Sequence, residues 1–274
     1  MRYKFKYKPY EHQLEALKRS WNKKEFAYFM DMGTGKSKVL IDNMCVLYDR
    51  GEITGALIVA PKGVYRNWEQ GELPTHIPEH VMYDTVLWNP SQTKTQLEKQ
   101  NKLYVVDDNL KIFVMNVEAF STKKGCEAAE RFLNAHPSLM VIDESTTIKN
   151  KDAKRTKSIV KIGKVAQYRR ILTGSPVTKS PMDLYTQAEF LDEWLLGHSS
   201  FFSFQYEYAI VQRRSMGAHS FNQVVGYRNL DKLNGILENF SYRVKKEDCL
   251  DLPDKVYIKR SVELTEEQKS VYNS

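Results

Sequence analysis

A glycine-rich segment at residues 32–37 has the residue types that bind phosphate. It directly follows an apolar run and directly precedes a helical pattern. Glycines let successive backbone N–H groups converge on phosphate oxygens, and the N-terminus of the following helix adds positive potential. Lys36 supplies a cation, and the Ser37 hydroxyl can ligate magnesium. The candidate nucleotide-binding residues of this loop are Met32, Gly33, Thr34, Gly35, Lys36 and Ser37.

Position 30 departs from the strict phosphate-loop pattern, which places glycine there. Met30 occupies the position, and this departure argues against the versions of the loop found in GTPases and small-molecule kinases. The alternative interpretation is a chance cluster of glycine, lysine and serine in a surface turn. The apolar run before the segment and the helical pattern after it favour the phosphate loop.

A second apolar run, residues 139–142, ends in the adjacent carboxylates Asp143 and Glu144. Parallel sheets present their ligand-binding groups at the carboxyl ends of the strands. Asp143 would hold magnesium, and Glu144 would orient and deprotonate the water that attacks a γ-phosphate. Such a pair alone more often begins a solvated loop, but its combination with the phosphate loop favours catalysis. We therefore expect Lys36, Asp143 and Glu144 to be catalytic, and Ser37 to join Asp143 as a magnesium ligand.

The elements that must position these residues alternate along the first 180 residues. Short apolar runs followed by helical patterns predict an α/β fold with a mostly parallel central sheet flanked by helices. The expected strands are residues 26–30, 56–60, 85–88, 112–116, 139–143 and 170–173. The expected helices are residues 12–21, 36–48, 64–70, 124–135 and 153–164.

The pattern changes after Pro181 and predicts a small appendage rather than more sheet. Aromatic residues crowd residues 190–208, and a polar stretch with Gly217 and Gly226 predicts a hairpin. Residues 231–240 have a helical pattern. Near the end, Thr265 and Gln268 have the spacing of a capping box and predict the start of another helix.

The composition fits a globular protein with a polyanionic partner. The chain has 274 residues, 42% of them hydrophobic, and a net charge of +7. Its three cysteines lack the paired spacing of a zinc site or a disulfide framework, so a reducing, cytoplasmic setting is expected. No run reaches the roughly 18 apolar residues of a membrane span, so no membrane partner is expected.

Further motifs stand in the order seen in helicase superfamily two, and particularly in its Swi/Snf branch. Residues 9–13 resemble the Q motif, and residues 58–62 with Asn67 and Trp68 resemble motif Ia. Residues 143–150, ending in Ile-Lys-Asn, are similar to motif II, and residues 172–176 are similar to motif III. Nearly end to end, the chain resembles the first RecA-like lobe of a Swi/Snf-type DNA translocase. Its compact spacing is more similar to bacterial or phage members of that family.

The resemblance implies a RecA-like P-loop domain at residues 1–180 that binds Mg²⁺ and ATP. It implies that residues 181–274 form a small α/β appendage, with a helical and hairpin subdomain that closes this lobe and begins a linker to an absent second lobe. The segment resembling that closure is Arg243, Lys245, Lys246, Asp248, Leu250, Leu252 and Pro253. The absent lobe would supply arginines to the transferring phosphoryl group, so the isolated chain would hydrolyse ATP weakly.

The resemblance also implies residue roles. Gln13 would contact the adenine, and Lys36 the β- and γ-phosphates. The residues implied in DNA contact, or in coupling DNA to the nucleotide, are Pro61, Lys62, Lys149, Thr173, Gly174 and Ser175. One departure stands in motif II, where Ser145 and Thr146 replace the family's common Ala and His, so the usual route from the γ-phosphate to motif III is in doubt.

Basic residues gather between motifs II and III. Residues 145–179 contain ten basic residues and one acidic residue, which favours sequence-independent binding to nucleic-acid phosphates over a merely solvated helix face. They are Lys149, Lys151, Lys154, Arg155, Lys157, Lys161, Lys164, Arg169, Arg170 and Lys179. Residues 2–8 alternate basic and aromatic side chains, and here an edge strand with a charged face is favoured over a base-stacking platform. Trp68, Trp88 and Trp194 are expected in the core.

Three functions remain open from the sequence. The first is an ATP-dependent translocase on double-stranded DNA. The second is a strand-separating helicase of superfamily two, and the third is a non-catalytic, nucleotide-gated DNA-binding module. The expected location is the cytoplasm of a bacterial or phage-infected cell, or the nucleus if the source is eukaryotic.

Overall fold

The central element is one parallel sheet that contains every strand expected from the sequence. The computed structural model describes residues 3–91, 93–216, 219–249, 261 and 263–272. Within these residues seven strands pair in parallel in the order β3-β4-β2-β5-β6-β1-β9. Their bounds in that order are Tyr83–Leu87, Leu110–Asn116, Gly55–Ala60, Ser138–Asp143, Tyr168–Thr173, Glu25–Met30 and Ser241–Val244. The inner strands are buried along almost their whole length, which explains why they read as continuous apolar runs.

Strand β9 corrects the expectation that the sheet ends with residue 173. It pairs with β1 at the edge of the sheet, with Tyr242 opposite Tyr28 and Val244 opposite Met30. Only its first and last residues are buried, and it includes an arginine, so no apolar run marks it. The part of the chain that was expected to form an appendage therefore contributes a strand to the central sheet.

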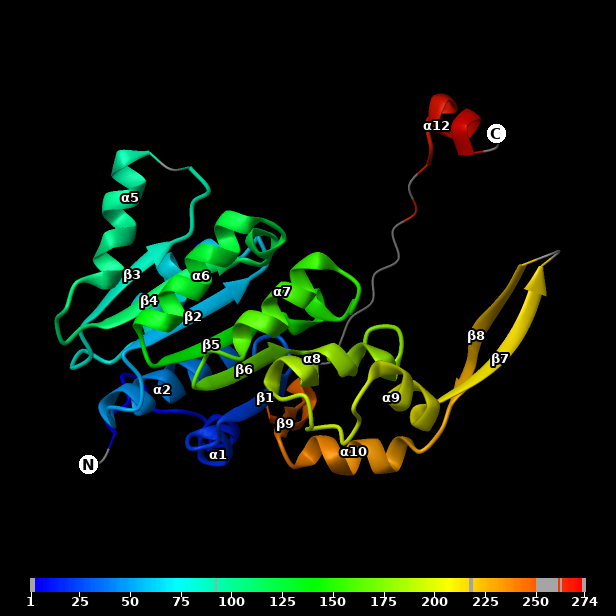
Figure 1. The fold of residues 1–274 in the computed structure, drawn as a ribbon, viewed down its shortest axis with the longest axis horizontal. Coiled ribbons are helices and arrows are strands. Elements are labelled where there is room, and N and C mark those ends of the chain that lie inside the picture. Colours follow the sequence, from blue (N-terminus) through cyan, green and yellow to red (C-terminus); the bar gives the residue numbers. More distant parts are fainter. Residues whose placement is uncertain (1–2, 92, 217–218, 250–260, 262, 273–274) are drawn as a thin grey trace.

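Helices cover both faces of the sheet (Figure 1). One face packs against α1 (Glu11–Ser20), α2 (Lys36–Asp49) and α4 (Leu73–His76). The other packs against α6 (Lys123–Ala135), α7 (Lys154–Gly163) and α8 (Leu184–Leu191). Helices α1, α2, α6 and α7 confirm the helices that were predicted from the periodicity of the sequence. The expected helix at 64–70 is divided into α3 (Tyr65–Asn67) and a π-helical segment, Trp68–Glu72. Helix α5 (Lys94–Asn101) was not predicted.

The C-terminal part contains the expected hairpin. Strands β7 (Ala209–Met216) and β8 (His219–Tyr227) pair antiparallel between α9 (Phe201–Tyr208) and α10 (Leu230–Glu238). Figure 1 shows this hairpin projecting away from the sheet. Two short helices follow, α11 (Lys246–Cys249) and α12 (Glu266–Tyr272). The capping box is confirmed, because the Thr265 N–H donates to Gln268 and the Gln268 N–H donates back to the Thr265 hydroxyl. Leu250, Leu252 and Pro253 lie outside the described residues.

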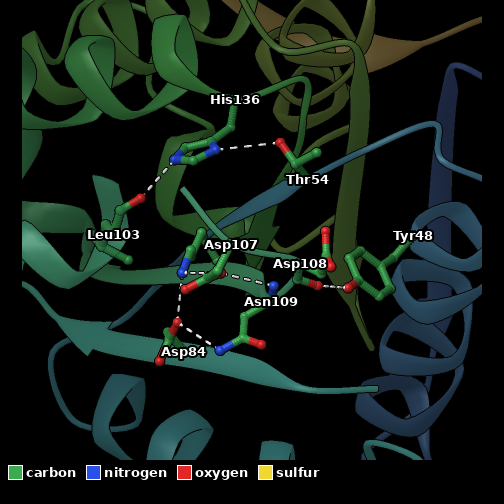
Figure 2. Close-up of polar contacts among 9 residues, drawn as sticks. Tyr48, Thr54, Asp84, Leu103, Asp107, Asp108, Asn109 and His136 are labelled. Carbon is green, nitrogen blue, oxygen red and sulfur yellow. Dashed lines mark hydrogen bonds and ion pairs between the residues drawn. The ribbon is translucent and has the colours of Figure 1, made fainter. Parts of the chain in front are cut away.

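A polar cluster fixes the amino-terminal edge of the sheet, opposite the strand ends that carry the candidate site. The buried Lys111 ammonium lies 2.6 Å from Asp84 and 2.7 Å from Asp107. Figure 2 shows Asn109 bound to both aspartates, and His136 bridging Leu103 and Thr54. These contacts join β3, β4 and the turns before β2 and β5, so we assign the cluster a structural role.

Two expectations about aromatic residues are wrong. The described part of the N-terminal segment, residues 3–8, is irregular rather than an edge strand. Tyr3 and Phe5 pack on the α2 face, and the Tyr3 hydroxyl donates to Asp42, so this segment is a strap across the core. Trp194 is 62% exposed, whereas Trp68 and Trp88 are buried as expected. No helix in the described ranges has the length and apolar character needed to cross a membrane.

Arg170 does not belong to the basic surface. Its side chain is fully buried, and its five N–H groups donate to the Asn43 amide oxygen and to backbone carbonyls of Ser20, Lys23, Lys24 and Arg169. Burial lowers the pKa of this guanidinium, and the carbonyls around the end of α1 compensate its charge. Arg170 therefore ties β6 to the turn between α1 and β1.

We predict that Arg170→Lys and Arg170→Ala each lower the free energy of unfolding by about 3–5 kcal/mol, because either change leaves buried carbonyls without a donor. Denaturant unfolding measures this, with the exposed Lys161→Ala as the control, which should change it by less than about 0.5 kcal/mol. Wild-type stability combined with weaker DNA binding in Arg170→Ala would restore the surface interpretation.

Candidate active site

The phosphate loop is a tight turn between β1 and α2. Gly33 and Gly35 have φ angles of 85° and 82°, which non-glycine residues rarely adopt. The Asp31 carbonyl accepts hydrogen bonds from the Thr34 N–H and the Thr34 hydroxyl, at 3.3 and 2.7 Å. Helix α2 begins at Lys36, so the unpaired N–H groups of its first turn lie at the loop. The local structure is the one that the glycine spacing predicts.

Helix α1 packs its N-terminal turn against this loop. Gln13 is 5% exposed, accepts a hydrogen bond from the Tyr10 N–H and donates to the Thr34 carbonyl at 3.1 Å. The His12 ring nitrogen lies 2.8 Å from the same carbonyl. A Cβ atom on Gly35 would fall 2.2 Å from the Gln13 amide nitrogen, so the contact requires glycine. Gln13 therefore buttresses the loop, and its contact with adenine stays a prediction.

Three strand ends converge beside the loop. The Lys36 ammonium lies 3.5 Å from one Glu144 carboxylate oxygen, and the Thr173 hydroxyl lies 3.4 Å from the other, to which it donates. Lys36 follows β1, Glu144 follows β5, and Thr173 ends β6, which lies between those two strands. Glu144 has a φ of 49°, an unfavourable left-handed conformation of the kind that often marks functional positions.

Asp143 is held by two donors. One oxygen accepts from the Trp68 indole N–H and the other from the Glu144 N–H, each at 3.0 Å. Burial raises the pKa of the Asp143 carboxyl above its usual range, and the Trp68 hydrogen bond opposes that rise. Trp68 was expected in the core and in motif Ia, but not as a donor to Asp143, because hydropathy patterns register its apolar ring and not its N–H. It lies on the π-helical segment Trp68–Glu72, and such segments often occur at functional sites.

The donor set at this edge fits Mg²⁺ held together with a nucleotide. Asp143 offers a carboxylate and Ser37 a hydroxyl, and oxygen is the ligand that Mg²⁺ prefers. Among the described residues no group of three or more histidine, cysteine, aspartate or glutamate side chains could hold a metal. This sparse set is expected for Mg²⁺, which commonly takes one or two protein ligands and completes its shell with phosphates and water.

Motif II is linked to motif III through a side chain that the sequence interpretation missed. The fully buried Ser145 hydroxyl donates to the Gln187 amide oxygen at 2.6 Å. The Gln187 amide nitrogen donates to the carbonyls of Pro176 and Asp183, at 2.8 and 2.7 Å. Ser145, one of the two departures from the family pattern, therefore makes a polar connection to the loop after β6.

The candidate coupling residues fall into three groups. Gly174 lies against the phosphate loop, because its Cβ position is 3.4 Å from the Asp31 Cα, and the Ser175 N–H donates to Thr173. Lys149 instead contacts the Thr178 hydroxyl and lies 4.0 Å from the Asp183 carboxylate. Pro61 and Lys62 follow β2 at the same sheet edge, where Lys62 is exposed.

The basic residues after motif II divide into exposed lysines and residues that have polar or acidic partners. Lys154, Lys157, Lys161 and Lys179 are exposed, whereas Arg155 donates to the Thr147 carbonyl. Others have acidic partners: Lys151 with Asp152, Lys164 with Glu193 and Arg169 with Glu25. The exposed positive charge is therefore concentrated on α7.

A mostly parallel sheet with a glycine-rich loop and paired carboxylates at its carboxyl edge defines a RecA-like nucleotide-binding lobe. The chain belongs to the SNF2-related domain family, which matches residues 17–274. It therefore falls within the Swi/Snf ATPases of helicase superfamily two, as its motifs predicted.

Known relatives match most of the chain. It is 26% identical to the CHD3-type chromatin-remodeling factor PICKLE of Arabidopsis thaliana, covering 97% of this chain and 19% of that protein. It is also 26% identical to the chromatin-remodeling ATPase INO80 of Debaryomyces hansenii, covering 88% of this chain and 17% of that protein. The Sulfolobus solfataricus SWI2/SNF2 ATPase core, solved in complex with dsDNA, has the same fold, with a TM-score of 0.66 and 22% identity. That match covers 98% of this chain and 52% of the archaeal chain.

We predict that Trp68→Phe weakens Mg²⁺-dependent nucleotide binding about tenfold, because the donor that orients the Asp143 carboxylate is lost. Loss of this donor raises the Asp143 pKa further, so more of the carboxyl is protonated at lower pH. The defect should therefore be larger at pH 6 than at pH 8, measured by titrating Mg²⁺ at a fixed nucleotide concentration. Trp88→Phe, at a core tryptophan on the other face of the sheet, is the control. An equal defect at both pH values would contradict the assigned role.

Proposed function

We propose that this chain is the first lobe of an ATP-driven motor that moves along duplex DNA. The observation that carries the proposal is the meeting of Lys36, Glu144 and Thr173 beside the phosphate loop. A cation, a carboxylate and a hydroxyl in that position are the groups that hydrolysis of a nucleoside triphosphate uses. Membership of the SNF2-related family supports ATP as the nucleotide.

In the proposed reaction, loop N–H groups bind phosphate oxygens, and Lys36 neutralises charge on the β- and γ-phosphates. Ser37 and Asp143 would hold Mg²⁺, which would withdraw charge from the phosphate oxygens. Glu144 orients the attacking water and accepts its proton. Because Lys36 exchanges its Glu144 partner for phosphate, nucleotide binding releases that carboxylate to act as a base.

Coupling to DNA would pass through the loop after β6. Thr173 touches the catalytic carboxylate, and Gly174 packs on the phosphate-loop backbone, so occupation of the nucleotide site changes the contacts of this loop. Gln187 holds the other end of the same loop through the Pro176 carbonyl. In this proposal, these contacts connect the nucleotide site to motif III. They take the place of the family's usual motif II histidine, which Thr146 replaces in this chain.

Duplex DNA is the proposed track. The exposed lysines of α7 follow motif II directly and would bind phosphates without reading sequence, so the affinity should fall steeply with salt. The archaeal relative with the same fold was solved with dsDNA, which supports this choice. Selective unwinding of tailed substrates by the complete protein would instead indicate a strand-separating helicase.

A second lobe is expected to complete the ATPase. The chain spans less than a fifth of the two chromatin-remodelling relatives and about half of the archaeal chain. Arginines contributed from another lobe or protein accelerate such reactions by about 10³–10⁵. We therefore infer weak hydrolysis by this chain alone. The contact of Glu144 with Lys36 and Thr173 favours a catalytic lobe over a non-catalytic, nucleotide-gated module.

We predict that Glu144→Gln slows single-turnover hydrolysis of Mg-ATP by about 10²–10⁴, because the general base is lost. Binding of Mg-ATP should persist, since the substitution removes a negative charge near the phosphates. Phosphate release and equilibrium nucleotide binding measure the two effects.

Glu98→Gln, at an exposed position on α5, provides the matched control and should leave both quantities unchanged. Hydrolysis at the wild-type rate by Glu144→Gln would show that another residue is the catalytic base. Absence of Mg-ATP binding by the unsubstituted chain would contradict the proposed function itself.

A further inference from the structure

We propose that Lys246 is a second phosphate-binding cation of the nucleotide site; this inference rests on the proposed function. Strands β9 and β1 are parallel neighbours, so the residues after both strands emerge at the same sheet edge. Lys246 comes two residues after β9, and its side chain reaches the phosphate loop. Its Cε and Nζ atoms each lie 3.7 Å from the position that a Cβ on Gly33 would occupy.

Asp31 holds Lys246 in this place. The Asp31 carboxylate accepts a hydrogen bond from the Lys246 N–H at 3.0 Å, and the Asp31 N–H donates to the Val244 carbonyl at 3.0 Å. The Asp31 carbonyl also accepts the two hydrogen bonds from Thr34 that close the phosphate loop. One residue of the loop therefore fixes both the turn that binds phosphate and the start of α11.

The charge of Lys246 is available to a ligand. Within the described ranges its ammonium makes no hydrogen bond or ion pair, although it lies beside a loop built to bind anions. The adjacent Lys245 differs in its partner and in its position. It lies 3.2 Å from the Glu247 carboxylate and lines a cavity of about 600 Å³ between Gly174 and α10. Of the two lysines, Lys246 is the one positioned for a nucleotide phosphate.

Two cations on one phosphate group would have a consequence beyond affinity. Lys36 starts α2 inside the first domain, whereas Lys246 starts α11 in the segment by which the chain leaves the sheet. Phosphate bound by both would hold that segment to the phosphate loop, and release of the phosphate would loosen it. The structure thus assigns α11 a nucleotide-dependent attachment.

Equilibrium binding of Mg-ADP and Mg-ATP to this chain tests the proposal, with displacement of a fluorescent ADP analogue as the readout. Lys246→Gln should weaken both nucleotides about tenfold, the effect of losing one charge-assisted phosphate contact. It should also make the affinity less sensitive to salt, because a screened charge pair is gone. Lys246→Arg should restore the affinity, and Lys245→Gln should bind as the wild type does.

The outcomes separate this inference from the function on which it rests. Wild-type affinity and salt dependence in Lys246→Gln, with binding lost in Lys36→Gln, overturn the role of Lys246 and leave the nucleotide site intact. Absence of Mg-ADP and Mg-ATP binding by the unsubstituted chain overturns both. If Lys246→Gln lowers the thermal unfolding midpoint, Lys246→Arg decides: restored affinity supports the proposal, and failure to restore it overturns the proposal.

Discussion

The attraction between Lys36 and Glu144, 3.5 Å apart, joins two loops that are separated by much of the first half of the chain. It can form only because β1, β6 and β5 are parallel neighbours, so that the segments after them meet at one edge. The same edge places Thr173 on Glu144, Gly174 on Asp31 and the start of α11 on the phosphate loop. Parallel pairing is thus the constraint that brings the candidate catalytic residues of distant motifs together.

The sequence predicted the parts of this arrangement that depend on local patterns. Buried strands such as β2 and β5 must be apolar throughout, and Gly33 and Gly35 must adopt left-handed angles, so both features are visible in the residues themselves. Strand β9 was missed because it is short, half polar and defined only by pairing with β1, whose sequence is some two hundred residues away. Edge strands stabilised by a distant partner carry little local signal.

Polar groups inside the core account for several other differences. Arg170 was assigned to a basic surface because charge normally indicates exposure, yet its donors are all satisfied by the Asn43 amide oxygen, the Arg169 carbonyl and carbonyls at the end of α1. Trp68 was predicted as core, but its N–H orients Asp143. The Ser145–Gln187 link depends on two helical segments meeting, and neither residue has a spacing that predicts the other. Such pairings follow from packing in three dimensions, which a single sequence does not encode in any short pattern.

Magnesium-ATP turnover by this chain, with and without duplex DNA and beside Lys36→Ala, tests the central claim most directly. A lone first lobe should bind Mg-ATP through Lys36 and hydrolyse it very slowly, because no second lobe supplies an arginine to the transferring phosphoryl group. Rapid, DNA-stimulated turnover that disappears in Lys36→Ala would contradict that account and show that the chain completes its own active site. Turnover and binding that are unaffected by Lys36→Ala would contradict the assignment of the phosphate loop.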